Sequence, residues 1–184
     1  MSFADIEEEF FTIDPQKVEG LINPSTKGII AVNLFGGAAD LDALTTIASR
    51  HNLFLLEDNA QAPAATLNQS FLGTIGNAGV FSLNRHKAIQ SGEGGVIVTP
   101  DARIAERCQL IRNHGENVVD EYNITDISNT LGLNYRMTEL EAAIARAQLE
   151  KLNEISSCRI AQAQFLSSAL TEFDGLAAPS LRKN

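Results

Sequence analysis

The chain has 184 residues, of which 44% are hydrophobic and 20% are charged, and these proportions exclude an intrinsically disordered protein. Its 23 acidic and 14 basic residues leave a net charge of −9, which argues against a broad nucleic-acid-binding surface. The acidic N-terminal stretch and the lack of a long apolar run argue against a secretory leader and a membrane span, and predict a soluble cytoplasmic protein.

The first half of the chain alternates between helix and strand patterns. Residues 14–22 predict a short helix that Asp14 caps. A β-branched run at 28–35 and an apolar run at 53–56 predict two buried strands, with an amphipathic helix at 40–50 between them. Strand, helix and strand with short links form a βαβ unit, so we expect the two strands to be parallel.

A basic, polar segment lies between two further strand patterns in the middle of the chain. The strands at 79–83 and 95–99 are separated by too few residues for a helical crossover, so we expect them to pair antiparallel. The glycines at 92–95 precede a strand and not a helix, so they do not match a phosphate-binding helix start. Lys87 lies in this segment. A loop lysine is usually a solvated side chain, but one held in a dry pocket can act as a nucleophile, and the residues alone leave both interpretations open.

The second half of the chain is mostly helical. Thr99, followed by a proline, predicts the start of one helix. Residues 116–135 are polar and show no clear period. Thr138 and Glu141 then form a capping box that opens a long helical stretch, which a second helical pattern at 160–170 continues.

Polar side chains follow the second predicted strand, at the end where open α/β sheets place their ligand crevices. Asp58 lies at the carboxyl end of this strand, and its neighbour Glu57 could equally be the residue that points inward. Asp58 could also simply cap the following turn. Gln61 is polar in a run of small apolar residues. The residues alone therefore leave the roles of these side chains open.

Four motifs follow one another along the chain: LLEDNAQA, FSLNRHKAIQSGEGGVIVT, ERCQLIRNHG and GLNYRMTELEAAIA. Together they resemble the sugar aminotransferases of the DegT/StrS type, which use pyridoxal 5′-phosphate (PLP). The resemblance implies the large domain of a fold-type I PLP transferase. This is an α/β, three-layer fold whose mostly parallel sheet has one antiparallel strand and is flanked by helices, followed here by a long C-terminal helical segment.

The family is commonly much longer than this chain. The resemblance therefore implies an incomplete PLP-binding large domain at 1–136 and a helical segment at 137–184 that leads towards a small C-terminal domain. A helix whose start binds the PLP phosphate is expected before Met1, and the small domain is expected after Asn184. The expected protein is the central piece of an aminotransferase.

The resemblance also assigns roles near the cofactor. Lys87 matches the catalytic lysine that binds PLP covalently and later moves a proton between cofactor and substrate carbons. Asp58 matches the acid that pairs with the pyridinium nitrogen, where a carboxylate keeps that nitrogen protonated. Gln61 matches an amide beside the ring hydroxyl, and Ser82 matches a hydroxyl that binds the phosphate.

Two further residues match a loop that reaches the active site of a neighbouring subunit. Asn134 would reach the PLP phosphate and Arg136 would bind substrate, so the resemblance implies a homodimer with shared sites. An amide and a guanidinium held at a rigid helix start suit a phosphate and a carboxylate. On the residues alone, these two side chains could equally be a solvated start of a helix.

The function that the resemblance implies is PLP-dependent transfer of an amino group from glutamate to a nucleotide-linked keto-sugar, within polysaccharide or nucleotide-sugar biosynthesis. No metal, nucleic-acid or membrane partner is implied. One alternative is a non-catalytic remnant or interaction module that retains the fold. The other is a PLP-dependent sugar dehydratase, since a histidine replaces the lysine in some of those relatives. Here His86 lies one place early and Lys87 holds the position, which favours transamination.

Overall fold

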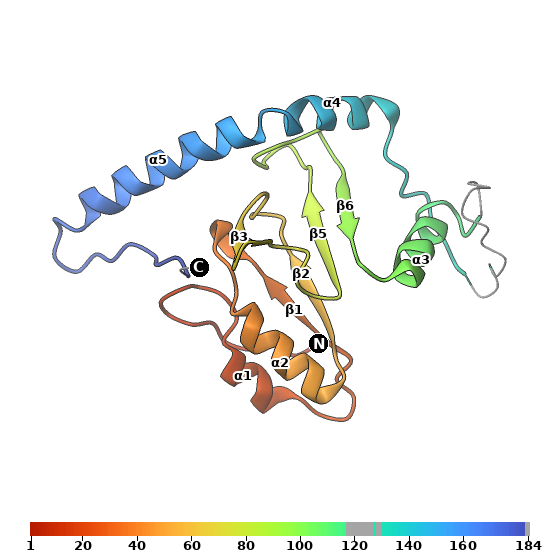
Figure 1. Cartoon of the computed structure of the whole chain (residues 1–184), viewed down its shortest axis with the longest axis horizontal. Coiled ribbons are helices and arrows are strands. Elements are labelled where there is room, and N and C mark those ends of the chain that lie inside the picture. Colours follow the sequence, from red (N-terminus) through yellow and green to blue (C-terminus); the bar gives the residue numbers. More distant parts are fainter. Residues whose placement is uncertain (117–126, 128–129, 183–184) are drawn as a thin grey trace.

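A four-stranded sheet, the helices beside it and a long helical arm make up the chain (Figure 1). The structure is a computed structural model that describes residues 1–116, 127 and 130–182. In chain order its elements are α1 (Pro15–Leu21), β1 (Gly28–Val32), a 3-10 helix (Leu34–Gly36), α2 (Leu41–His51), β2 (Phe54–Asp58), β3 (Thr66–Leu67), β4 (Ser70–Phe71), β5 (Ala78–Ser82), β6 (Gly95–Val98), α3 (Ala102–Arg112), α4 (Glu139–Leu149) and α5 (Leu152–Leu170).

The sheet has the strand order β1-β2-β5-β6. β1 pairs with β2 and β2 pairs with β5 in parallel, whereas β5 and β6 run antiparallel. Because α2 connects β1 to β2, these three elements are the predicted βαβ unit. The prediction of a mostly parallel sheet with one antiparallel strand and flanking helices is confirmed. β3 and β4 form a separate two-stranded hairpin.

One face of the sheet packs against α1 and α2. The apolar residues of α2 recur with the helical period, so they form one stripe along the helix. This stripe meets the alternate side chains of β1 and β2 that point to the same side. Burying a leucine contributes about 1.5–3 kcal/mol, so this layer is a main source of the folding free energy. The buried core residues of these elements are Leu41, Leu44, Ile47, Ala48, Ile29, Ala31 and Leu55.

The other face of the sheet carries exposed apolar side chains. Ile30 of β1 and Ile97 of β6 each expose 55% of their surface. Both lie on the same side of the sheet, because Ile30 is in register with Leu56 and Ile97 is in register with Val80. In the part of the chain that the structure describes, this face of the sheet therefore leaves apolar side chains exposed.

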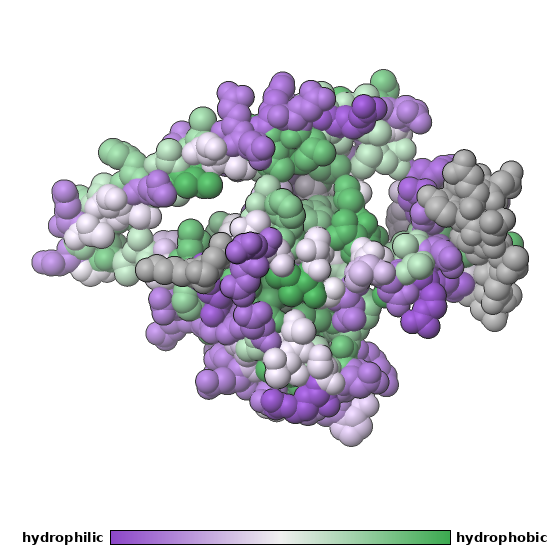
Figure 2. Space-filling view, viewed as in Figure 1, coloured by the Kyte–Doolittle hydropathy of each residue, from purple (hydrophilic) through white to green (hydrophobic). Residues whose placement is uncertain are grey.

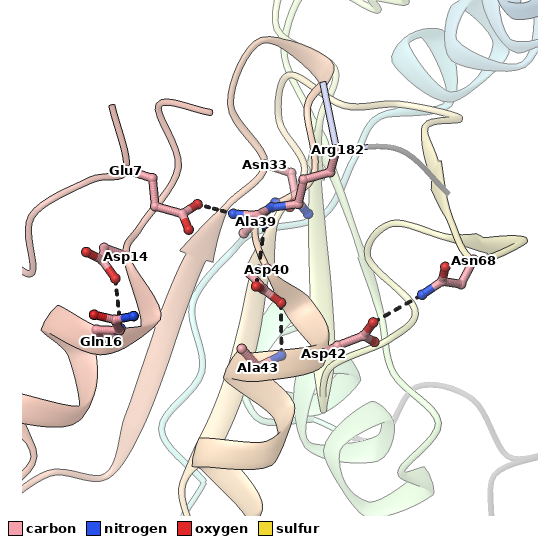
Figure 3. Close-up of polar contacts among 10 residues, drawn as sticks. All are labelled: Glu7, Asp14, Gln16, Asn33, Ala39, Asp40, Asp42, Ala43, Asn68 and Arg182. Atoms are coloured by element: carbon pink, nitrogen blue, oxygen red, sulfur yellow. Dashed lines mark hydrogen bonds and ion pairs between the residues drawn. The ribbon is translucent and has the colours of Figure 1, made fainter. Parts of the chain in front are cut away.

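Acidic side chains cap the first two helices, Asp14 as predicted and Asp40 as an additional cap. The carboxylate of Asp14 accepts a hydrogen bond from the main-chain N–H of Gln16 at 2.8 Å, and that of Asp40 accepts one from Ala43 at 3.0 Å (Figure 3). Each bond satisfies one of the N–H groups that the first turn of a helix leaves free. These caps fix where α1 and α2 begin.

The predicted helix start at Thr99 is wrong by two residues. The helix α3 begins at Ala102, and Asp101 caps it by accepting a hydrogen bond from the main-chain N–H of Arg103 at 2.8 Å. The hydroxyl of Thr99 instead donates to the main-chain oxygen of Asn77 at 2.7 Å. The same hydroxyl accepts a hydrogen bond from the main-chain N–H of Asp101 at 3.2 Å, so Thr99 joins the distant Asn77 to the residue that caps α3.

The helices α4 and α5 form an arm that passes over the loop between β5 and β6 (Figure 1). The arm is held there by a small apolar cluster in which Leu83 and Ile89 of the loop pack with Leu152 of α5. Figure 2 shows apolar residues gathered at this crossing. The predicted helical stretch is thus confirmed as two helices, and the domain division at residue 136 stays a prediction. Within the described ranges, no helix has the length and apolar character that a membrane crossing requires.

The last described residues return to the N-terminal part of the chain. Arg182 forms ion pairs with Glu7 and, at 3.4 Å, with Asp40 (Figure 3). Its guanidinium carbon also lies 4.2 Å from the centre of the Phe10 ring. A guanidinium that is paired with carboxylates and stacked on an aromatic ring holds the tail against the first turn of α2.

The capping box of α4 predicts a pH-dependent helix start. The main-chain N–H of Thr138 donates to the carboxylate of Glu141 at 3.0 Å and, with the Thr138 hydroxyl at 2.8 Å, lowers the pKa of Glu141 below its ordinary value. The carboxylate therefore stabilises the helix above the unfolded-state pKa, and this contribution is lost as the pH falls through the lower folded-state pKa. We expect NMR titration of Glu141 to show the lowered midpoint.

The matched control is Glu139→Gln, which removes a first-turn carboxylate and leaves the capping box in place. We expect Glu141→Gln, and not this control, to abolish the acid-side loss of α4 structure. A Glu141 midpoint at or above the value of an unstructured peptide would contradict the prediction.

Candidate active site

Asp58 and Ser82 lie on the same face and at the same edge of the sheet. Asp58 is the last residue of β2 and Ser82 is the last residue of β5, its parallel neighbour. Asp58 is in register with Val80, and Ser82 is two residues further along, so both side chains point to the same side. Both residues are half-buried. The structure thus brings together a carboxylate and a hydroxyl that are 24 residues apart in the sequence.

The structure separates the environments of the two acids at the end of β2. Glu57 is fully buried on the side of the sheet that faces α1 and α2. Asp58 points to the open side, where one carboxylate oxygen accepts a hydrogen bond from the main-chain N–H of Ala60 at 2.9 Å. The turn-capping interpretation of Asp58 is therefore confirmed. In the described part of the chain its second oxygen, Oδ2, has no hydrogen-bond donor, so it is available to a ligand.

Gln61 joins the ends of β1 and β2. Its side-chain oxygen accepts a hydrogen bond from the main-chain N–H of Phe35 at 3.1 Å. Phe35 has a φ of 56°, a left-handed conformation that is uncommon for a bulky residue, and it exposes 72% of its surface. The sequence analysis placed Phe35 at the end of the predicted strand at 28–35, which was too long, since β1 ends at Val32 and Phe35 lies in the 3-10 helix that follows.

Lys87 lies in the loop between β5 and β6, and it is half-buried. Asn84 organises this loop from within. Its side chain accepts a hydrogen bond from the main-chain N–H of His86 at 3.1 Å and donates one to the carboxylate of Glu93 at 2.8 Å. Its main-chain oxygen accepts a hydrogen bond from the N–H of Lys87 at 2.9 Å. The Lys87 main chain is therefore fixed by a turn and not left as a free loop.

The hydroxyl of Ser82 is also oriented by Asn84. The main-chain N–H of Asn84 donates to the hydroxyl oxygen of Ser82 at 3.3 Å. Because this bond uses the oxygen as an acceptor, the hydroxyl hydrogen remains available for an anion. One residue thus links the hydroxyl at the strand end to the lysine loop.

Asn134 and Arg136 contact neither Asp58 nor Lys87 within the described part of this chain. The guanidinium of Arg136 donates to the side-chain oxygen of Asn113 at 2.7 Å, and its main-chain N–H donates to the side chain of Asn134 at 3.4 Å. Both residues are exposed. The single chain therefore brings Asp58, Ser82 and Lys87 to one region and leaves this pair outside it.

The whole chain matches the family model described as the DegT/DnrJ/EryC1/StrS aminotransferase family, over residues 1–184. The chain belongs to this family, which confirms the resemblance seen in its motifs. One relative is the L-glutamine:2-deoxy-scyllo-inosose aminotransferase of Micromonospora echinospora, which is 38% identical over 173 residues. That match covers 91% of this chain and 41% of the relative, so the chain spans less than half of the relative's length.

Solved structures share the fold. The aminotransferase from Psychrobacter cryohalolentis has a TM-score of 0.91 and 30% sequence identity, covering 99% of this chain and 49% of that one. The GDP-4-keto-6-deoxy-D-mannose-3-dehydratase of E. coli, solved with bound hydrated PLP, has a TM-score of 0.81 and 30% identity. It covers 92% of this chain and 47% of that one. These likenesses confirm the predicted fold class.

The chemistry of the site residues fits PLP. The cofactor has a basic ring nitrogen, an anionic phosphate and an aldehyde, which call for an acid, a hydrogen-bond donor and an amine. Among the described residues, one carboxylate oxygen of Asp58 and the hydroxyl hydrogen of Ser82 have no hydrogen-bond partner, and Lys87 adds an amine on the loop directly beyond Ser82. The exposed apolar side chains on the same sheet face suit an aromatic ring.

The contacts of Asn84 predict the effect of removing its side chain. Asn84→Ala deletes the hydrogen bonds to His86 and Glu93, so we expect faster amide exchange at His86 and Lys87 and a loss of about 1 kcal/mol in stability. Gln90→Ala is the matched control, since Gln90 is an exposed residue of the same loop. Equal exchange at His86 and Lys87 in the two variants would contradict this view of the loop.

Proposed function

We propose that the protein acts as a PLP-dependent aminotransferase that transfers an amino group from glutamate to a nucleotide-linked keto-sugar. The observation that carries this proposal is the placement of Asp58 and Ser82 on one face and edge of the sheet, with Lys87 on the next loop. Membership of the aminotransferase family supports the reaction type. Glutamate as the donor and the nucleotide-linked keto-sugar rest on the family resemblance, whereas one relative is named for L-glutamine and 2-deoxy-scyllo-inosose.

Asp58, Ser82 and Lys87 would each contact a different part of PLP. PLP, when bound, supplies an electron sink for negative charge on the substrate carbon. The carboxylate of Asp58 would hold the ring nitrogen and keep a proton on it, because the opposite charge favours the protonated form. The hydroxyl of Ser82 would donate to the phosphate. The Nζ of Lys87, when neutral, would anchor the aldehyde end and carry a proton to and from the substrate carbon.

Gln61 would lie beside the ring hydroxyl. Its oxygen is already held by the main-chain N–H of Phe35, so its amide group is directed by the end of β1. The amide hydrogens are the part of the side chain that remains for the cofactor. Gln61 would therefore orient the ring and take no part in proton transfer.

Asn134 and Arg136 would serve a neighbouring subunit. Both are exposed, and their polar contacts within this chain leave Asp58, Ser82 and Lys87 untouched. We propose a cytoplasmic homodimer in which Asn134 reaches the partner's PLP phosphate and Arg136 reaches its substrate. Amide and guanidinium donors suit those two anions.

A sugar dehydratase is the second candidate. The dehydratase of E. coli shares the fold, and its sequence identity to this chain, 30%, equals that of the aminotransferase from Psychrobacter cryohalolentis. His86 is exposed, and its Nε2 accepts a hydrogen bond from the guanidinium of Arg85 at 3.2 Å. It is therefore occupied by its neighbour, whereas Lys87 is half-buried. The lysine at this position favours transamination.

The proposal predicts which lysine PLP modifies. Reduction of the PLP-treated protein with borohydride, followed by peptide mass spectrometry, should find the cofactor on Lys87. Lys87→Ala should lose the adduct and bind PLP at least about tenfold more weakly, since the covalent anchor is gone. Lys27→Ala, at an exposed position, is the control and should behave like the wild type. Adduct on Lys17, Lys27 or Lys151, or none at all, would sink the proposal in favour of a non-catalytic module.

The shared-site proposal predicts complementation between two inactive variants. Lys87→Ala lacks the lysine, and the double variant Asn134→Ala, Arg136→Ala lacks the loop donors. Equal mixing should recover about a quarter of wild-type transamination, because half of the dimers are hybrids and each hybrid has one complete site. If hybrid dimers form and no activity returns, Asn134 and Arg136 do not act across the interface.

A further inference from the structure

Three buried polar side chains lie at the end of the sheet, directly behind Asp58. Glu57 and Asn33 are completely buried, and Asn59 exposes 1% of its surface. A buried carboxylate is costly unless both of its oxygens are hydrogen-bonded. The chain therefore has to place several hydrogen-bond donors around Glu57. The segments that supply these donors are the segments that Glu57 connects.

Glu57 accepts three main-chain hydrogen bonds from one turn. Its Oε1 accepts from the N–H groups of Ile75 at 2.8 Å and Gly76 at 2.7 Å, and its Oε2 accepts from Gly73 at 2.6 Å. Bonds from main-chain N–H groups to a carboxylate are stronger than bonds between neutral groups. The turn at 73–76 leads into β5. These bonds therefore position the start of β5, the strand whose last residue is Ser82.

Asn33 extends the same network to β1. Its side-chain N–H donates to Glu57 Oε2 at 3.3 Å and to the side-chain oxygen of Asn59 at 2.6 Å. Its side-chain oxygen accepts from the main-chain N–H of Ala39 at 2.9 Å (Figure 3). Its own main-chain N–H donates to the main-chain oxygen of Asp58 at 3.0 Å. The network therefore also includes a hydrogen bond from β1's following residue to the main chain of Asp58.

Close approach of main chain to main chain also shapes this turn. A Cβ on Gly73 would lie 2.5 Å from the side-chain nitrogen of Asn59, and a Cβ on Gly79 would lie 2.1 Å from the oxygen of Gly73. Glycine allows this close approach of main chain to main chain. Within the turn the hydroxyl of Thr74 donates to the main-chain oxygen of Phe71 at 2.7 Å, and Glu57 supplies the acceptors for the three main-chain N–H groups.

We propose that Glu57 is a positioning residue for the site, and that it acts through Asp58 and Ser82. Asp58 follows Glu57 on the same strand and points to the opposite face, so a shift of Glu57 moves Asp58 with it. The turn that Glu57 holds leads into the strand that ends in Ser82. This inference rests on the proposed function, since it assigns to Glu57 the spacing between the groups that bind the ring nitrogen and the phosphate of PLP.

The test is Glu57→Gln, which keeps the size of the side chain and replaces one acceptor oxygen with an NH₂ group. An amide has acceptor capacity on one oxygen only, so it cannot serve all of these donors. We expect faster amide exchange at Gly73, Ile75 and Gly76. We also expect PLP to bind about tenfold more weakly, which is the loss of affinity typical when a residue that orients a binding side chain is mutated. The visible absorption of bound PLP should shift in the same direction as in Asp58→Asn.

The matched control is Leu44→Ala, a core truncation on the same side of the sheet that removes none of these hydrogen bonds. It should lower the unfolding temperature but leave PLP affinity within about twofold of the wild type, because the network stays intact. Equal PLP affinity and absorption in Glu57→Gln and Leu44→Ala would overturn the inference.

A second variant keeps the test decisive if Glu57→Gln does not fold. Asn33→Ala leaves the three main-chain donors of Glu57 and the main-chain bond to Asp58 in place and removes only the side-chain bonds to Glu57, Asn59 and Ala39, so PLP affinity should fall by a smaller factor. Affinity equal to that of Leu44→Ala would again overturn the inference. A failure of the proposed function gives a different result from a failure of this inference. In that case the wild-type protein itself would carry no PLP on Lys87.

Discussion

The register between β2 and β5 is the constraint on which the proposed site depends. Asp58 pairs with Val80, which places it beside the strand residue that precedes Ser82 by two positions. Side chains alternate between the two faces of a sheet, so a slip of one residue would put Glu57 in the place of Asp58. The buried polar network around Glu57 is what opposes that slip. The buried carboxylate of Glu57 thus serves the fold, and its neighbour Asp58, on the opposite face of the sheet, is the residue proposed to bind the cofactor.

The lysine loop depends on contacts of a different kind. Asn84 fixes its main chain from within, while Leu83 and Ile89 anchor it to Leu152 of the arm. Met137 packs on the same cluster and directly follows Arg136. The loop that carries Lys87 and the segment proposed to serve a neighbouring subunit therefore pack against the same apolar cluster.

The sequence predicted the features that local patterns determine. Period and turn residues located the βαβ unit, the antiparallel pair and the capping box at Thr138. The role of Glu57 could not be predicted, because its donors lie in a turn 16 to 19 residues further along the chain. The contact between Arg182 and Glu7 joins residues 175 positions apart. Thr99 shows the same limit, since its hydroxyl donates to the distant carbonyl of Asn77, a contact that the local pattern does not predict.

A crystal structure of the protein with PLP bound tests most directly the central claim, that PLP sits at the shared edge of β2 and β5. We expect the ring nitrogen within hydrogen-bond distance of the Asp58 carboxylate, the phosphate beside the Ser82 hydroxyl, and continuous density from the cofactor to Lys87 Nζ. PLP at another place on the molecule, or with its phosphate turned towards Asp58, would contradict the claim.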